Sequence, residues 1–242
     1  ADSSASPPLH VIVPAGSVSA TFNMMTSPVA SDKIVKVTAI SSAVSVTAQL
    51  TLKPAALLSL TFAPSSVVGG ASVTGKVQLS APVATGAGDQ IVTLSCAGTI
   101  TIPPNVVIHE GESSAAFLIN TIPVAMDMAA PVTATYRGVG KTSNLNLKAP
   151  ALSSLTIAPL TAKSGANVTF AIKLSGIAAQ DVTVNLSSNN TALPVPVTTV
   201  VNAGLASRSL TVKSGTVTAN TVITLSAKLG TVTKTVNFTL QP

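Results

Sequence analysis

The sequence of 242 residues predicts an all-β protein made of tandem two-sheet sandwiches in a linear array. Three observations lead to this prediction: a β-rich composition, an internal repeat, and short segments in which apolar and polar residues alternate. Apolar residues make up 46% of the chain, whereas aromatic residues account for 2% and charged residues for 8%. Most of the apolar share is Val, Ala, Leu and Ile, with Thr and Ser at polar positions. Because β-branched side chains suit a pleated surface and crowd a helix, this composition favours strands.

The internal repeat sets the expected domain boundaries. The segment Leu60–Pro64 (LTFAP) returns as Leu155–Pro159 (LTIAP), an offset of 95 residues, and an offset of 93 relates the second halves of the last two repeats. These offsets predict three regions: a partial repeat that corresponds only to a repeat's second half at 1–56, a sandwich at 57–150 and another at 151–242.

Alternation within each repeat predicts the individual strands. The odd positions of 71–79 and the even positions of 166–174 are apolar or Gly, which indicates strands with one buried and one wet face. About seven such strands separated by turns in each repeat are typical of a two-sheet sandwich. The inward positions of the other predicted strands are Val92-Leu94-Cys96 and Val182-Val184-Leu186, then Ala20-Phe22-Met24, Ala115-Phe117-Ile119 and Leu210-Val212, then Val35-Val37-Ala39, Val132-Ala134 and Ile223-Leu225-Ala227, and last Leu50-Leu52, Leu145-Leu147 and Phe238-Leu240.

Two stretches of the sequence carry a family resemblance. Residues 68–82 (VGGASVTGKVQLSAP) resemble the second strand of bacterial immunoglobulin-like (Big-type) repeats, and residues 11–22 (VIVPAGSVSATF) resemble the middle strands of the same family. The resemblance covers essentially the whole chain and implies tandem immunoglobulin-like β-sandwich domains in a linear array. It also implies an extracellular or cell-surface location in stalks, adhesins, sheaths or filaments. The family brings no catalytic residues, and a fold alone does not define a function.

The ionisable residues do not form a catalytic pattern. Glu110 and Glu112 are the only closely spaced acidic pair, and we interpret them as part of a solvated hairpin. His10 and His109 do not occupy matching positions of the repeat, so a shared metal site is not supported. We therefore predict no enzymatic activity, no cofactor and no metal. The net charge of +6 comes from scattered basic residues without the stripe that nucleic-acid binding needs, and no apolar run is long enough for membrane insertion.

Some single residues have a structural interpretation. Asp32, Asp127 and Asn220 align between repeats, and we expect them to cap turns. Cys96, the single cysteine, aligns with Leu186 at an inward position, which predicts a buried, unpaired thiol acting as a small hydrophobic group. Glycan attachment is an expectation only in a host that glycosylates Asn, at the sequons of Asn167, Asn185, Asn189 and Asn237.

The partial repeat at 1–56 is expected to present an uncovered apolar face, since the first three strands of a repeat have no counterpart in it. Contiguous apolar surface in water normally marks an interaction site. We expect its partner to be a copy of this chain or further repeats of a longer parent chain, and we favour upstream chain over strand donation by a neighbouring copy. The candidate self-association face consists of Ala20, Phe22, Met24, Val35, Val37, Ala39, Leu50 and Leu52.

Three functional hypotheses follow from these features. The first is a non-catalytic structural component of an extracellular filament, sheath or cell-surface stalk, because short linkers containing Pro54 or Pro150 limit the swing between domains. The second is the stalk of a cell-surface adhesin whose binding tip lies outside this chain. The third is an accessory binding module of a secreted enzyme, which five Phe, one Tyr and no Trp disfavour because aromatic platforms are scarce.

Overall fold

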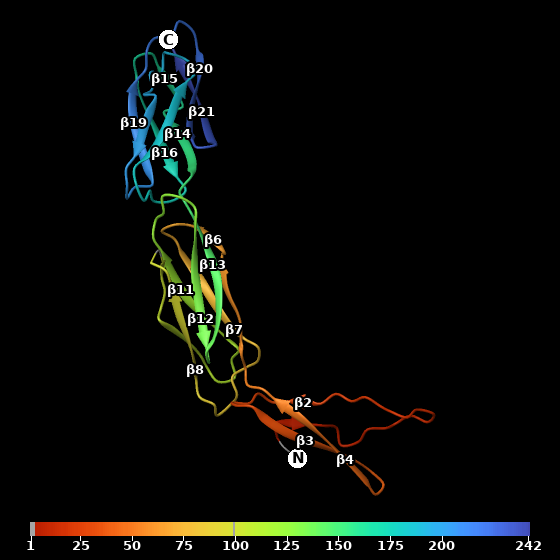
Figure 1. Cartoon of the computed structure of the whole chain (residues 1–242). Helices are drawn as coiled ribbons and strands as arrows, with labels where there is room; N and C mark the ends of the chain where they lie inside the picture. Colours follow the sequence, from red (N-terminus) through yellow and green to blue (C-terminus); the bar gives the residue numbers. More distant parts are fainter. Residues whose placement is uncertain (1–2, 99) are drawn as a thin grey trace.

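The computed structural model describes residues 3–98 and 100–242, and it is an elongated molecule of strands and loops (Figure 1). Within these two ranges there is no helix, and so none that is long and apolar enough to cross a membrane. Ala1 and Asp2, which begin the region expected at 1–56, lie outside the described residues.

The middle part of the chain folds into two packed sheets. One sheet has the strand order β5-β7-β11-β9, and the other has the order β10-β8-β12-β13-β6. Between β5 and β6 the chain passes from the first sheet to the second, where β6 runs parallel to β13. This arrangement is an immunoglobulin-like sandwich. The strands are β5 (Leu57–Ala63), β6 (Ser66–Val68), β7 (Ser72–Leu79), β8 (Gln90–Cys96), β9 (Ile100–Thr101), β10 (Asn105–Ile108), β11 (Ser114–Thr121), β12 (Met128–Tyr136) and β13 (Val139–Lys148). We call this unit the middle sandwich.

The last part of the chain repeats this plan in what we call the terminal sandwich. Its sheets have the orders β14-β16-β19 and β15-β21-β20-β17-β18, and β15 again runs parallel to the last strand. The strands are β14 (Leu152–Ala158), β15 (Thr161–Lys163), β16 (Asn167–Leu174), β17 (Val182–Ser188), β18 (Thr198–Val201), β19 (Ser207–Lys213), β20 (Thr221–Leu229) and β21 (Val232–Gln241). The predicted fold class, all-β with tandem immunoglobulin-like sandwiches in a linear array, is confirmed.

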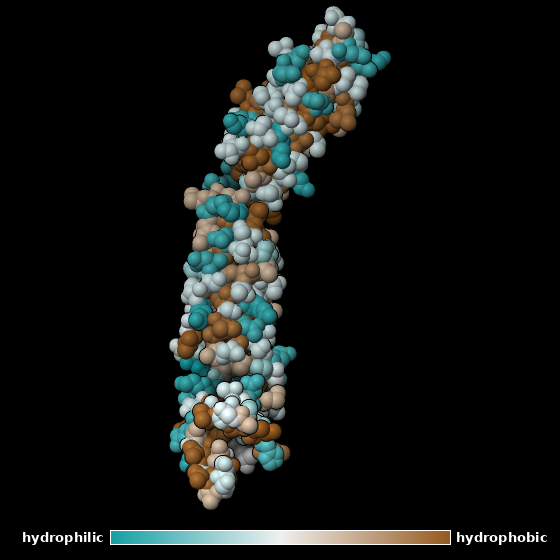
Figure 2. All heavy atoms as spheres, turned by 90° about the vertical axis from the view of Figure 1, so that its right-hand side faces the viewer, coloured by the Kyte–Doolittle hydropathy of each residue, from teal (hydrophilic) through white to brown (hydrophobic). Residues whose placement is uncertain are grey.

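Alternation along the strands produces the two cores. On β7 the inward residues Val73, Val77 and Leu79 are buried, and on β16 Val168 and Phe170 begin an equally buried row. Each such side chain contributes roughly 1.5–3 kcal/mol by leaving water. The outward residues of both strands are mainly polar, and hydrophobic and hydrophilic atoms are interspersed along the molecule in Figure 2.

Residues 3–56, the leading segment, form less structure than either sandwich. Strands β1 (Ala5–Ser6) and β2 (Met25–Thr26) make a short pair, and β3 (Lys33–Ser41) and β4 (Val44–Leu52) make a hairpin at one end of the molecule (Figure 1). The strand predicted through Ala20, Phe22 and Met24 is wrong, since residues 7–24 are loop and turn. The stretch at 11–22 that resembles the middle strands of bacterial immunoglobulin-like repeats lies in this loop.

The prediction that Cys96 is buried is also wrong, because the side chain is exposed at the end of β8. Sheet register explains the error. Leu94 lies opposite Ala134, and Leu186 lies opposite Ala227, so Leu94 and not Cys96 is the counterpart of Leu186. A slip of two residues preserves the inward and outward alternation of a strand, so the sequence pattern alone did not reveal it.

Candidate functional site

The β3–β4 hairpin has the same register as the last hairpin of each sandwich. Lys33 lies opposite Leu52 in the leading segment, and Met128 lies opposite Leu147 in the middle sandwich, 95 residues later in both strands. The β20–β21 hairpin continues the correspondence with the offset of 93. The leading segment is therefore related to the second half of a sandwich by backbone pairing as well as by sequence.

The structure divides the candidate self-association face into two groups. Val35 and Leu52 are buried together with Ala5, and Met24 and Leu50 pack against them. These four members of the predicted face thus form a small core within the leading segment. The other members do not join it: Phe22 and Ala39 are exposed, and Ala20 and Val37 are half-buried. Uncovered apolar surface therefore remains on the outer part of the hairpin and on the loop before it.

Further apolar side chains extend this surface. Leu9, Ile12 and Val18 are almost fully exposed on the loop, and they are joined by large exposed side chains on both faces of the hairpin. The exposed large apolar residues of the leading segment are Leu9, Val11, Ile12, Val13, Val18, Phe22, Met25, Ile34, Ile40, Val44 and Val46. Exposed apolar surface of this extent is typical of docking sites and of aggregation-prone segments.

Arg137 joins the leading segment to the middle sandwich. It lies in the turn between β12 and β13 with a φ of 49°, and its Nη1 donates to the carbonyl of Ala30 at 3.0 Å. Its guanidinium lies 5.3 Å from the ring centre of Tyr136, while Nη2 donates to Gln90 Oε1 at 3.3 Å. The same Gln90 oxygen accepts the Tyr136 hydroxyl at 2.9 Å. Sequence reasoning missed this anchor, because the contact with Ala30 depends on the domain arrangement and not on a local motif.

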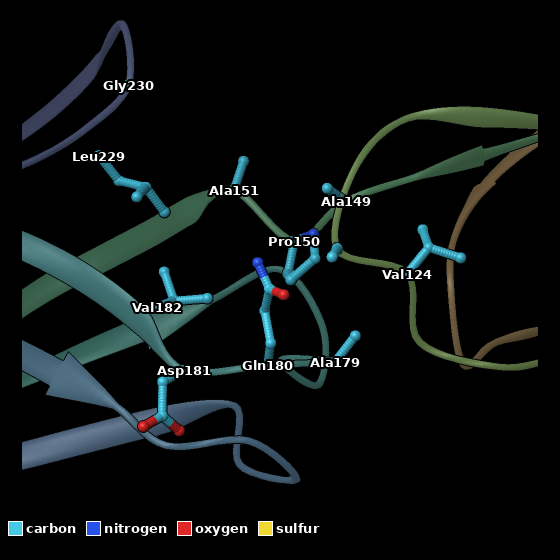
Figure 3. A pocket seen from close by; sticks show the side chains of 11 residues that line it. Val124, Ala149, Pro150, Ala151, Ala179, Gln180, Asp181, Val182, Leu229 and Gly230 are labelled. Atoms are coloured by element: carbon cyan, nitrogen blue, oxygen red, sulfur yellow. The ribbon is translucent and has the colours of Figure 1, made fainter.

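The junction between the two sandwiches uses the same loops as the junction before it. Residues 84–87, in the loop before β8, line a hollow of about 290 Å³ next to the leading segment, and residues 179–181, in the shorter loop before β17, line one of about 430 Å³ next to the middle sandwich. Figure 3 shows Pro150 of the linker between Val124 on one side and Val182 on the other. The loop before β8 and the loop before β17 therefore take part in successive interfaces, and Val29 and Ala30 correspond to Val124 and Ala125 on the opposite side.

Both linkers are held by side-chain oxygens of the sandwich that follows them. The backbone N–H of Ala56 donates to Ser80 Oγ at 3.0 Å, and that of Ala151 donates to Ser175 Oγ at 2.9 Å, again 95 residues later. Such bonds fix the direction in which the chain enters each sandwich.

Asp127 and Asp32 contact the residues where each last strand passes into its linker. Asp127 accepts from Lys148 Nζ at 2.7 Å and from the Ala149 N–H at 2.9 Å. The hydrogen bond from Lys148 and the one from Ala149 lower the pKa of the Asp127 carboxyl. The equivalent pair, Asp32 and Lys53, is wider at 3.9 Å. Asp127 was expected to cap its own turn, but its carboxylate instead accepts a backbone N–H 22 residues along the chain, at the start of the linker.

The remaining ionisable candidates support loops. His109 Nδ1 lies 2.7 Å from Asp89 Oδ2 with both side chains exposed, and Glu110 accepts the N–H of Gly88, so these residues link neighbouring turns. Glu112 and His10 are exposed. Within residues 3–98 and 100–242 there is no group of three or more His, Cys, Asp or Glu that could hold a metal ion.

The four sequon asparagines are all exposed. Two of them already use their amide oxygens: Asn189 Oδ1 accepts the N–H of Thr224 at 2.8 Å, and Asn237 Oδ1 accepts its hydroxyl at 3.0 Å. Asn167 and Asn185 lie on strands β16 and β17 of the terminal sandwich.

Comparisons with known proteins give distant structural similarity only. No family model matches the chain, and no curated protein matches it. Among solved structures, the bacterial integrin-binding protein invasin is 18% identical over 76% of this chain and 40% of its own, with a TM-score of 0.41. The Escherichia coli adhesin FdeC is 12% identical over 87% of this chain and 74% of its own, with a TM-score of 0.34. The I9–I11 tandem of titin is 12% identical over 90% of this chain and 76% of its own, also at 0.34. These values are too low to transfer a function.

Proposed function

We propose that this chain is a non-catalytic structural component of an extracellular filament, sheath or cell-surface stalk. The observation that carries the proposal is the repetition of the junction, in which equivalent loops line two successive interfaces and equivalent linkers are held by Ser80 and Ser175. A chain that repeats its interface as well as its domain extends as a rod, because each added unit enters at the same point and in the same direction.

Specific contacts limit bending at the junction between the sandwiches. An ideal Cβ built on Gly176 of the terminal sandwich would lie 2.6 Å from Val68 Cγ1 of the middle sandwich, so the two domains approach closely there. Pro150 restricts the linker, and Asp127 holds the residue before it. These features suit a stiff spacer that holds its two ends apart.

The chemistry of the surface agrees with this role. The ionisable groups that do come together, such as Asp89 with His109, are exposed and bonded to loops, whereas catalytic groups need an enclosed site in which a pKa can be tuned. The low content of charged residues also weakens repulsion between rods that lie side by side.

Electron microscopy and small-angle scattering of the purified chain test the proposal. We expect extended particles with a length close to that of the structure, and ordered fibres at high concentration if the chain polymerises. Isolated rods at every concentration would favour the adhesin-stalk alternative over the filament. A matched variant, Pro150→Gly with Ala149→Gly, should broaden the distribution of angles between the sandwiches. Compact particles from the unaltered chain would contradict both roles.

A further inference from the structure

The leading segment keeps every pairing that the second half of a sandwich makes with itself. Ala5 lies opposite Thr26 in the β1–β2 pair, just as Ile100 lies opposite Thr121 in the middle sandwich, 95 residues later. The turn at Gly16 is also kept, with φ values of +81° there and +78° at its counterpart Gly111. Together with the β3–β4 hairpin, these features show that the segment folds as half of a sandwich.

What the leading segment lacks is every pairing with strands of the first half. In the middle sandwich, β10 pairs with β8, and most of β11 pairs with β7. Their counterparts in the leading segment, residues 10–13 and 19–24, are loop. In the same sandwich β12 pairs with β8 and β13 pairs with β6, whereas β3 and β4 are paired only with each other among the described residues. The missing partners are thus the counterparts of β6, β7 and β8.

Exposure of the apolar side chains follows the same division. Phe22 is 48% exposed, whereas its counterpart Phe117 is 7% exposed because its ring lies over Gly75 of β7. Ala39 is exposed, whereas its counterpart Ala134 is fully buried beside β8. Val35 and Leu52, which the segment covers with its own Ala5, are buried as in a complete sandwich.

We propose that the leading segment is an acceptor half-sandwich whose apolar face and two free strand edges bind a first half-repeat with the strand pattern of β5 to β8, residues 57–96. The incoming strand of the β8 type pairs antiparallel with β3, and the strand of the β6 type pairs parallel with β4. The strand of the β7 type draws residues 19–24 into its sheet and covers Phe22.

The occupant is a polypeptide stretch of this type and not a sandwich of a second copy. In the middle sandwich β5 to β8 are already paired and their inward side chains are buried, and the same holds for β14 to β17 in the terminal sandwich. Donation by either would unfold a complete domain. A spare first half-repeat adds apolar contacts without removing any, which makes it the energetically favoured occupant.

The direct test extends the full chain by a second copy of residues 57–95 placed immediately ahead of Ala1. Hydrogen exchange read residue by residue should slow at 20–24 and 35–39 by on the order of 100-fold, toward the protection of 115–119 and 130–134. The matched control carries Val73→Asp and Val77→Asp in the added copy only, and it should leave exchange at 20–24 as fast as in the unaltered chain. Unchanged exchange in the soluble extended chain would overturn the proposal.

A second measurement does not require the extended chain to be soluble, and it also tests whether a second copy of the chain is the occupant. A peptide of residues 57–96 added to the unaltered full chain should protect 20–24 in a saturable way, and Phe22→Asp should abolish that protection. Absence of protection by the peptide and by the extension would overturn the proposal. So would concentration-dependent dimerisation of the unaltered chain that by itself protects residues 20–24, because the occupant would then be a second copy.

Discussion

The middle and terminal sandwiches fill the same core position from opposite strands. In the middle sandwich, Gly75 of β7 lies opposite Phe117 of β11, whereas in the terminal sandwich Phe170 of β16 lies opposite Leu210 of β19. One large ring therefore occupies the space between the two strands in each case. The comparison teaches that the fold conserves the volume of this site and not the strand that supplies it.

Supplying the ring from β11 has a physical cost on the opposite strand, β7, which must carry a glycine. An ideal Cβ built on Gly75 would lie 2.4 Å from Phe117 Cζ, so no larger residue fits beneath the ring without displacing it. Glycine within a strand is entropically unfavourable, and here close packing of the aromatic ring offsets that loss. The terminal sandwich needs no such glycine, because its ring comes from β16.

The largest expected effect tests the aromatic residue itself. Phe170→Ala should lower the free energy of unfolding of the terminal sandwich by about 3–5 kcal/mol, since Phe170 is fully buried and its truncation leaves a cavity in the core. Hydrogen exchange resolved by domain is the measurement. Phe117→Ala is the control and should accelerate exchange in the middle sandwich only. Equal acceleration in both domains from either variant would show that the two cores are not independent.

A smaller effect is expected from filling the glycine site. Gly75→Ala should destabilise the middle sandwich by roughly 1–3 kcal/mol, because its methyl group meets the Phe117 ring. The double variant Gly75→Phe with Phe117→Leu reproduces the arrangement of the terminal sandwich. It should therefore be more stable than the sum of the two single substitutions predicts. A double-mutant analysis of chemical denaturation measures the coupling. Additive losses would mean that the two positions do not share one volume.

The junctions are expected to respond to acid, and to a smaller extent. The pKa of Asp127 is lowered in the folded protein, so its contribution to stability is present at neutral pH and is lost as pH falls below about 4 through the folded-state pKa. Asp127→Asn should remove the part of the acid dependence of stability that comes from this carboxylate. Thermal unfolding measured at a series of values from about pH 2 to about pH 7 tests this. Asp32→Asn is the matched control and should change less, because its lysine is 3.9 Å away. Indistinguishable profiles for Asp127→Asn and the unaltered chain would contradict this.

The smallest effect is expected at Cys96. Because the thiol is exposed, Cys96→Ser should change the free energy of unfolding by no more than about 0.5 kcal/mol. The native protein should also react with a thiol reagent at a rate close to that of the unfolded chain. Leu94→Ser, two residues earlier on the buried face, is the contrasting variant and should be strongly destabilising. Slow labelling of the native protein would place the thiol in the core after all.

The sequence predicted what local pattern controls. Alternation identified the strands of both sandwiches, and a turn of the repeat forms even in the leading segment, where Gly16 has the same positive φ as Gly111. A turn closes through neighbouring residues and needs no partner. The strand expected through Phe22 did not form, because a strand needs a distant partner and that partner has no counterpart in the leading segment.

Other features depend on register and on contact between domains. The exposure of Cys96 follows from a two-residue slip, and alternation with period two is unchanged by such a slip. Half of the candidate face proved to be a local core, since the short β1 strand supplies Ala5 as a cover. The bond from Arg137 to Ala30 spans 107 residues, and no spacing rule predicts it. Strands and turns could therefore be predicted from the sequence more reliably than the contacts between them.

The parallel pairing of β6 with β13, and of β15 with β21, has a mechanical consequence. In each pair one strand lies near the entry of the chain into the sandwich and the other near its exit. Tension between the ends of the molecule pulls these neighbours in opposite directions along their length. Their hydrogen bonds, which run across the strands, are loaded in shear and must break together and not one after another. Each sandwich thus resists stretching at the point where a pulling force enters it.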